Sequence, residues 1–246
     1  MADPKAVRGA ALITGGARRI GRALVTAAAD AGFDVAIHVR GVDDEAETAA
    51  AEVRARGRKA TILTCDLRKE STTVALVGEA EAELGPVTLL VNNASVFDED
   101  AFSDMNRASW DAHMETNLRA PLVLAQAFAR RLAADREGLI VNILDQRVLN
   151  PEPAFFSYTL SKAALWEATR MLAKALAPRV RVNGIGPGPT LPSTYQDQAG
   201  FEAEVRDTLL GHAVAPGEIG QALRYLIDAK SVTGQLIAVD AGQHLS

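Results

Sequence analysis

Residues 9–21 read Gly-Ala-Ala-Leu-Ile-Thr-Gly-Gly-Ala-Arg-Arg-Ile-Gly, and a helix-like stretch follows over residues 22–31. The apolar first half is typical of a buried strand. The glycines after Thr14 let the backbone approach a ligand closely, and the N-terminus of the next helix offers free N–H groups and a favourable dipole to a phosphate. The stretch therefore predicts a strand, a phosphate-binding turn and a helix in direct succession.

Apolar runs and helical patterns alternate along the rest of the chain. The expected strands cover residues 10–14, 34–39, 59–64, 88–92, 138–144, 179–184 and 235–239. The expected helices cover residues 20–31, 44–56, 72–84, 107–132, 157–177, 201–210 and 219–228. Continuous apolar runs such as Leu89-Leu90-Val91 suit a parallel sheet covered on both faces. We therefore predict one α/β domain over residues 1–246, a Rossmann-like doubly wound sheet of seven parallel strands with helices on both faces.

Composition excludes several classes of protein. A chain of 246 residues with 48% hydrophobic residues suffices for one well-packed core. The net charge of -5 and a pI near 5.5 argue against nucleic-acid or membrane-surface partners. Cys65 is the single cysteine, which excludes an internal disulfide and fits a reducing cytoplasm. We expect no export signal, no membrane span and, because the histidines are scattered, no metal site.

Tyr158 and Lys162 are spaced so that both fall on one face of a helix. A positive charge beside a phenol favours the phenolate, so we expect Lys162 to lower the pKa of Tyr158 from about 10 and to make it a proton donor. Asp145 follows an expected strand and is a third ionisable group for the same place. The alternative reading is a half-buried tyrosine beside a solvated lysine.

With these motifs in view, the chain resembles the short-chain dehydrogenase/reductase family over nearly its whole length. The landmarks fall in the family's order: Thr14 to Gly21, Cys65-Asp66-Leu67, Asn92-Asn93-Ala94, Asn117, the Tyr158/Lys162 pair and Pro187-Gly188. The resemblance implies a small-molecule oxidoreductase that forms homodimers or homotetramers through the helices at 107–132 and 157–177. It also implies that Asn117 kinks its helix and holds a water linked to Lys162, whereas a satisfied asparagine in a helix interior is the alternative.

The end of the second expected strand predicts the cofactor. It reads Ile37-His38-Val39-Arg40-Gly41, with no carboxylate before Asp43 to bind a ribose 2′-hydroxyl. Arg40 suits a 2′-phosphate, and Arg18 offers a second positive charge, so we predict NADP(H). By resemblance, the cofactor-binding residues are Gly15, Arg18, Arg19, Ile20, His38, Arg40, Asp66, Leu67, Asn93, Ala94, Ser95, Tyr158, Lys162, Pro187, Gly188 and Thr190. Among them, Asp66 is expected at the adenine, Asn93 and Ala94 beside the ribose, and Thr190 at the carboxamide.

Two charged residues depart from the usual family pattern. Asp145 stands where most members carry a serine that binds a substrate carbonyl, and Arg19 replaces a glycine of the cofactor turn. An ionised carboxyl is acceptor-only, so it suits a substrate that presents N–H donors, and a protonated one can donate. The same departures occur in the pteridine reductases and the related dihydromonapterin and dihydrofolate reductases. By this resemblance, Phe97 stacks on a flat pterin ring, and Arg19 and Ser95 approach the substrate and the cofactor phosphates.

We therefore expect NADPH-dependent reduction of a C=N bond in a pterin-like ring. Tyr158, Lys162, Asp145 and Asn117 form the catalytic set, and Arg19, Ser95, Phe97, Asp145 and Tyr158 bind the substrate. Asp145 is either a substrate ligand or part of the proton transfer. The alternatives are a ketone or 3-oxoacyl reductase and a non-catalytic NADP(H)-binding protein. The compact loop at 189–200 departs from pteridine reductases, and its Tyr195, with nearby Phe201, either lines the pocket or packs a lid helix.

Overall fold

The computed structural model describes residues 7–193 and 195–246 of the chain. In that part, a sheet of seven strands runs in the order β3-β2-β1-β4-β5-β6-β7, and every neighbouring pair is parallel. The strands are β1 (Ala10–Thr14), β2 (Asp34–Val39), β3 (Ala60–Thr64), β4 (Val87–Asn92), β5 (Gly138–Ile143), β6 (Val180–Pro187) and β7 (Leu236–Val239). The predicted doubly wound α/β fold is confirmed. The expectation that residues 1–6 carry no export signal concerns residues outside this description.

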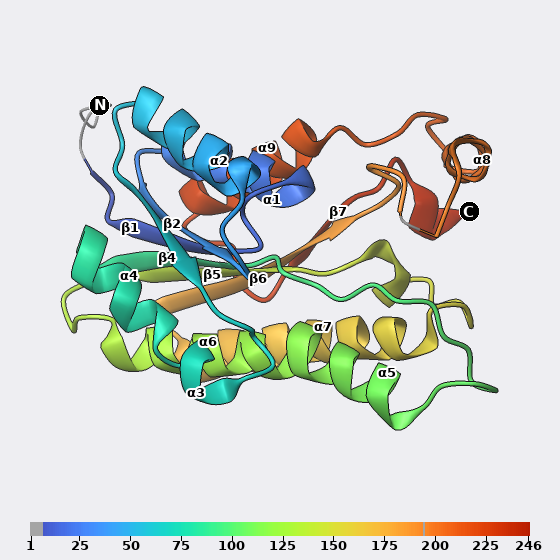
Figure 1. The fold of residues 1–246 in the computed structure, drawn as a ribbon, viewed down its shortest axis with the longest axis horizontal. Helices are drawn as coiled ribbons and strands as arrows, with labels where there is room; N and C mark the ends of the chain where they lie inside the picture. Colours follow the sequence, from blue (N-terminus) through green and yellow to red (C-terminus); the bar gives the residue numbers. More distant parts are fainter. Residues whose placement is uncertain (1–6, 194) are drawn as a thin grey trace.

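Helices cover both faces of the sheet (Figure 1). One layer holds α1 (Arg19–Asp30), α2 (Asp44–Ala55) and α9 (Pro216–Asp228). The other holds α3 (Glu70–Thr73), α4 (Leu76–Leu84), α5 (Arg107–His113), α6 (Ala120–Arg131) and α7 (Phe156–Leu176). The helix α8 (Gln198–Arg206) lies beyond one end of the sheet, close to the C-terminus. Among the described helices, none is both long and apolar enough to cross a membrane. The expected dimer or tetramer stays a prediction.

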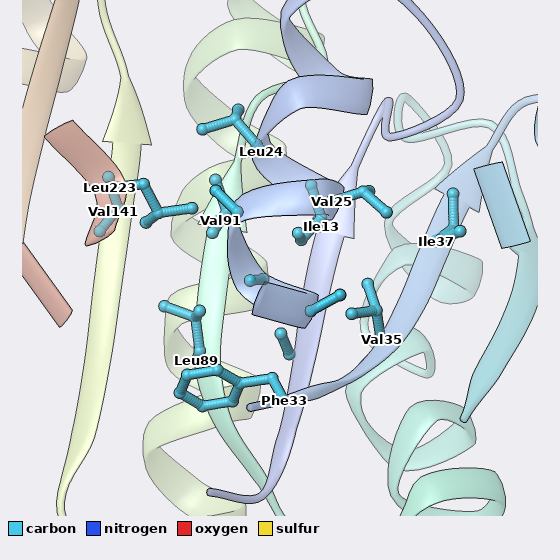
Figure 2. Packing of buried hydrophobic residues seen from close by; sticks show 14 of the residues in the cluster. Ile13, Leu24, Val25, Phe33, Val35, Ile37, Leu89, Val91, Val141 and Leu223 are labelled. Atoms are coloured by element: carbon cyan, nitrogen blue, oxygen red, sulfur yellow. The ribbon is translucent and has the colours of Figure 1, made fainter. Parts of the chain in front are cut away.

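The first helical layer packs on the sheet through small and branched apolar side chains. Figure 2 shows Leu24 and Val25 of α1 above Ile13 and Val91, with Leu223 of α9 beside Val141 of the next strand. These side chains are almost fully buried, as the continuous apolar runs in the strands require. β1 pairs with β2 on one side and with β4 on the other. Strands β2 and β3 are therefore added to the sheet in one direction from β1, and β4 to β7 are added in the opposite direction. Ligands of such sheets bind at the carboxyl ends of the strands, where this reversal opens a crevice.

Besides α9, which begins at Pro216 rather than at residue 219, three helices differ clearly from their sequence-based bounds. The helix expected over 72–84 begins earlier and is interrupted between α3 and α4. The long helix expected over 107–132 is divided by η1, a π-helical segment at Met114–Arg119. The last of these, α8, begins at Gln198 rather than at residue 201, because the Asp197 side chain accepts a hydrogen bond from the Gly200 N–H at 2.7 Å and caps the helix.

A chain of buried polar side chains joins the sheet to α7. The Asn92 amide of β4 donates to the Asn142 Oδ1 of β5 at 2.8 Å. The Asn142 amide in turn donates to the Thr169 hydroxyl of α7, also at 2.8 Å. All three side chains are buried, so these bonds satisfy polar groups that are shielded from water. This chain fixes α7 against the two central strands.

The first turn of α1 provides a test of the fold. A Cβ atom on Gly21 would lie 2.0 Å from the Gly15 carbonyl oxygen, whereas one on Gly217 in the first turn of α9 would meet nothing within 4 Å. We expect Gly21→Ala to lower the free energy of unfolding by about 1–3 kcal/mol, because the backbone of the turn must move. Gly217→Ala, the matched control, is expected to be neutral or mildly stabilising. Urea denaturation measures both, and equal stability of the two variants contradicts the prediction.

Candidate active site

The glycine turn between β1 and α1 is bound to the end of β4. The Asn93 amide donates to the carbonyls of Thr14 at 2.9 Å and Gly15 at 3.0 Å. The Thr14 hydroxyl accepts the backbone N–H groups of Asn93 at 2.9 Å and Ala94 at 3.0 Å. Gly15 has φ +63, and a Cβ there would lie 3.1 Å from the Ala94 Cα. Asn93 was expected beside a ribose, and the role of its amide in holding the turn was not predicted.

The N-terminus of α1 faces the crevice without a capping side chain. Arg18 is the N-cap residue, and its side chain makes no capping hydrogen bond to this described helix. Such an end presents unpaired N–H groups and the positive pole of the helix dipole. The glycines in front of it pack against neighbouring protein atoms, so that a side chain at Gly15 or Gly21 would clash. The turn therefore fits the pyrophosphate of a dinucleotide.

A groove beside this turn is formed by the ends of β1 to β4. Its walls include the predicted cofactor residues Gly15, Arg18, His38, Arg40, Asp66, Leu67, Ala94 and Ser95. Asp66, which is expected at the adenine, accepts a hydrogen bond from the Arg68 guanidinium at 2.7 Å. That bond is the main reason why the pKa of Asp66 falls to about 2. The groove thus brings the predicted adenosine-binding residues together.

The two arginines expected to bind a 2′-phosphate have different surroundings. Arg18 is ion-paired with Asp43 at 2.8 Å and with Glu45 at 3.1 Å, both at the start of α2. Arg40 is exposed at the end of β2 and has no ion pair within the described ranges. Two carboxylates thus compensate the charge of Arg18. The charge of Arg40 is free for an anion.

His38 links the glycine turn to the end of β3. It is buried, and its Nδ1 atom lies 3.4 Å from the backbone N–H of Gly15, while its Nε2 atom lies 3.2 Å from the Cys65 carbonyl. Burial lowers the pKa of His38, so the ring is neutral at physiological pH. A neutral ring with the proton on Nε2 donates to Cys65 and accepts from Gly15 at once. His38 therefore connects the glycine turn to the end of β3, in addition to lining the groove.

A second pocket, of about 430 Å³, lies at the ends of β4, β5 and β6. Asp145 lies two residues after the end of β5, and it shares the wall of this pocket with Tyr158 and Lys162 of α7. The Tyr158 hydroxyl donates to Asp145 Oδ2 at 2.6 Å, and Asp145 Oδ1 accepts the Arg147 N–H at 2.9 Å. The Lys162 ammonium donates to the Ile143 carbonyl at 2.8 Å. The structure thus assembles three of the four residues predicted to be catalytic in one pocket.

Burial governs the protonation of this trio. It raises the pKa of the Asp145 carboxyl, although the hydrogen bond from Tyr158 opposes the shift. Burial, the Asp145 charge and the bond to Asp145 together raise the pKa of Tyr158 well above its usual value. The expectation that Lys162 lowers this pKa is therefore wrong, because Lys162 is itself desolvated, with its pKa lowered to about 8, and is bound to a carbonyl. Tyr158 is a protonated phenol, the form that can donate.

Phe97 lies in an aromatic cluster with Phe155 and Tyr158. Its ring stacks on Phe155, with centroids 4.3 Å apart and planes inclined by 8°, and it lies nearly perpendicular to the Tyr158 ring, with centroids 4.6 Å apart. The Arg147 guanidinium lies 5.4 Å from the centre of the Phe155 ring. A third ring has no room between two rings in direct contact. One face of Phe97 is therefore covered by Phe155.

Asn117 lies in η1, the π-helical segment that divides the long helix. Its Oδ1 accepts from the Val96 N–H at 2.8 Å and the Ser95 hydroxyl at 3.1 Å. Its Nδ2 donates to the Val96 carbonyl at 2.9 Å and the Ser161 hydroxyl at 3.0 Å. The helix is distorted at Asn117 and the side chain is also satisfied, so both sequence-based readings describe part of the arrangement. A water linked to Lys162 stays a prediction.

The loop after β6 forms the outer wall of the pocket. Arg19 adopts a left-handed backbone conformation with φ 52, and its guanidinium donates to the Leu191 carbonyl of this loop at 3.1 Å. Thr190 bonds back to the Gly188 carbonyl at 3.0 Å. Ile20, Ser95, Pro187, Tyr195 and Phe201 also line the pocket. The open question about Tyr195 and Phe201 is thus answered in favour of the pocket wall.

Gln146, Arg147 and Phe155 are among the pocket residues that were not predicted from the sequence. Each is close in sequence to a predicted residue, since Gln146 and Arg147 follow Asp145 and Phe155 precedes Tyr158. Gln146 is 6% exposed, and Arg147 forms an ion pair with Glu152 at 3.2 Å. Proximity in sequence to Asp145 and Tyr158 could have indicated these residues. Which of the neighbouring side chains point into the pocket, however, depends on the turns after β5 and before α7.

Comparisons with known proteins agree on one family. A family model described as short chain dehydrogenase matches residues 9–202. The crystal structure of FolM alternative dihydrofolate reductase 1 from Brucella canis, complexed with NADP, is 47% identical and superposes with a TM-score of 0.94 over 99% of this chain and 97% of that one. The Brucella suis protein, also with NADP, is 48% identical with a TM-score of 0.93 over 97% and 96%. A 3-oxoacyl-[acyl-carrier-protein] reductase of Staphylococcus epidermidis is 27% identical over 243 residues, which cover 96% of this chain and 98% of the relative.

The lowered pKa of Lys162 predicts a pH dependence of stability. Its pKa is about 8 in the folded protein and about 10.4 in an unfolded chain, so between these values the unfolded chain binds a proton that the folded protein does not. The stability of the wild type should therefore rise with pH over this window, relative to Lys162→Met, which lacks the group. Urea denaturation from pH 7 to 10 measures the difference.

Lys174→Met, on the exposed side of the same helix, is the control. Its stability should follow that of the wild type across this range. Parallel curves for the wild type and Lys162→Met would mean that the ammonium is not desolvated in the folded protein.

Proposed function

The chain belongs to the short-chain dehydrogenase family, and we propose that it reduces a C=N bond in a pterin-like ring with NADPH. Its coarser identity as an NADP(H)-dependent oxidoreductase follows from the family and from neighbours crystallised with NADP. The observation that carries the substrate assignment is the buried Asp145 carboxyl bonded to the Tyr158 hydroxyl at 2.6 Å. A carboxyl there replaces the hydroxyl donor that suits a plain ketone.

The residues at the crevice fit NADP(H), which supplies a hydride when bound. The glycine turn and the N-terminus of α1 hold the pyrophosphate. Arg40 carries the uncompensated charge that a 2′-phosphate needs, and Asp66 lies in the groove for the adenosine. Lys162, whose ammonium is anchored to the Ile143 carbonyl, binds the nicotinamide ribose.

Tyr158 is the proton donor of the proposed reaction. Its phenol is kept protonated by burial and by Asp145, so a proton is held at the atom that faces the substrate. Asp145 orients that hydroxyl and has lone pairs left for an N–H group of the ring. General acid catalysis of this kind contributes roughly 10²- to 10⁴-fold to a rate.

Phe97 supports the assignment to a flat substrate. Phe155 covers one face of Phe97, and in this proposal the substrate ring lies against the other face, near Tyr158. A planar heterocycle stacked there gains about 0.5–1.5 kcal/mol beyond the burial of its area. Stacking also fixes the ring plane, so that one ring atom can be held close to the hydride donor.

A second candidate is the reduction of a 3-oxoacyl group, which is the activity named for the Staphylococcus epidermidis relative. The length of that match favours this activity. However, an oxoacyl carbonyl offers no hydrogen-bond donor, so Asp145 would have no group of the substrate to bind. The two candidates are separated by substrate.

We expect the purified protein to oxidise NADPH with 7,8-dihydrobiopterin and to be slow with 3-oxoacyl thioesters. Tyr158→Phe should lower kcat/KM by about 10²- to 10⁴-fold, because the proton donor is lost. Asp145→Ser should also lower kcat/KM, because the N–H acceptor and the partner of Tyr158 are lost. The loss of absorbance of NADPH measures all three.

The opposite pattern identifies the other candidate. Carbonyl reduction that appears or improves in Asp145→Ser, with no dihydropterin turnover by the wild type, would sink the pterin proposal. It would leave the family and the cofactor in place.

The choice of cofactor predicts different roles for two arginines. Arg40→Ala should raise KM for NADPH roughly tenfold and leave KM for NADH unchanged, because a charged hydrogen bond to the 2′-phosphate is lost. Arg18→Ala, the matched control, should have a smaller effect, since Asp43 and Glu45 already compensate its charge. Steady-state kinetics with both cofactors measure this. A preference of the wild type for NADH would contradict it.

A further inference from the structure

Gln146 is a buried polar side chain on the wall of the active-site pocket. It is 6% exposed, and its Oε1 atom has no hydrogen-bond partner among the described residues. A buried acceptor without a donor is costly, and native structures rarely keep one. A missing partner in a pocket wall therefore points to a ligand that supplies the donor.

Three other buried polar atoms in the described ranges lack a partner, and they differ from Gln146 in their place. They belong to Asn92, Ser157 and Thr159. None of these three residues lines the pocket. Gln146 thus combines two independent features, an unsatisfied acceptor and a position where a small molecule must bind.

The neighbours of Gln146 narrow the chemistry of that ligand. Asp145, the preceding residue, has both of its oxygens already bonded, one to the Tyr158 hydroxyl at 2.6 Å and one to the Arg147 N–H at 2.9 Å. The Gln146 Oε1 atom, in the turn that follows β5, has no such donor among the described residues. It needs an N–H or O–H group, which a plain ketone or an oxoacyl chain does not carry beside its carbonyl.

We propose that Gln146 is a specificity-determining residue that accepts a hydrogen bond from an N–H or O–H donor of the substrate. The inference rests on the proposed function, in that the substrate is a donor-rich dihydropterin. The donor is either a ring N–H or a hydroxyl of the side chain on the ring, and both satisfy the same oxygen. Gln146 then favours a nitrogen heterocycle over an acyl chain through a contact separate from the proton donor.

The test is Gln146→Met, which keeps the length of the side chain and removes its polar group. We expect KM for 7,8-dihydrobiopterin to rise about three- to tenfold, with KM for NADPH unchanged, because a hydrogen bond to the substrate is lost. We also expect the Tm of the protein without ligands to rise by about 2–4 °C, because an unsatisfied buried acceptor is removed. A purely structural role of Gln146 would lower that Tm instead.

Two dihydropterins distinguish the source of the donor. If KM rises equally for 7,8-dihydrobiopterin and for 6-methyl-7,8-dihydropterin, which lacks hydroxyls on its side chain, the donor is a ring N–H. If it rises for dihydrobiopterin alone, the donor is a side-chain hydroxyl. Both results support the proposal. Gln198→Met is the control, since the Gln198 amide already donates to Glu202 at 2.9 Å on the exposed side of α8.

The proposal is overturned if Gln146→Met leaves KM unchanged for both dihydropterins. A rise in KM for NADPH alone also overturns it, because the partner would then be the cofactor. Failure of the proposed function looks different, since the wild type itself would turn over neither dihydropterin. In that case the assignment of a dihydropterin donor to Gln146 falls with it.

Discussion

The site depends on the hydrogen bonds that fasten the glycine turn to the end of β4. Asn93 and Thr14 exchange them in both directions, and the close contact of Gly15 with Ala94 leaves no space for a larger residue at the turn. The position of the glycine turn determines where α1 begins. The apolar side chains of α1 cover the central strands (Figure 2). A ligand that occupies the crevice therefore meets backbone held by two strands and a helix rather than a free loop. This is the preorganisation that binding and catalysis require.

Burial has opposite effects on stability and on reactivity at the trio. A carboxyl, a phenol and an ammonium lie side by side in a region from which water is largely excluded, and each pKa is displaced toward the uncharged form. Placing ionisable groups there costs folding free energy, which the surrounding apolar core must offset. In return the hydroxyl of Tyr158 is oriented by one short hydrogen bond to Asp145. Displaced pKa values of this kind are typical of functional sites rather than of structural ion pairs.

Elements with strong periodicity and residues with family landmarks were predictable from the sequence, whereas contacts between distant loops were not. The strands at 10–14 and 34–39 match their expected bounds because apolar runs end at turn residues. A kink at Asn117 was expected only from the family resemblance, and its π-helical form was not expected, because the bonds of this side chain to Val96 join two separate parts of the chain. The ion pairs of Arg18 and the stacking of Phe155 on Phe97 likewise depend on the tertiary fold. The pKa of Tyr158 was predicted with the wrong sign, because spacing shows which charges are near but not how far water is excluded.

The buried chain from Asn92 through Asn142 to Thr169 has a consequence for how faithfully the protein assembles. Asn142 lies on β5, the strand that leads into Asp145, and Thr169 lies on α7, the helix that carries Tyr158 and Lys162. A slip of β5 by one residue against β4 would turn Asn142 to the other face of the sheet and strand three polar groups in an apolar core. A rotation of α7 would do the same to Thr169. Misaligned packing of β5 or α7 thus costs folding free energy at a point remote from the active site. Only the correctly packed molecule brings the carboxyl of Asp145, the phenol of Tyr158 and the ammonium of Lys162 together.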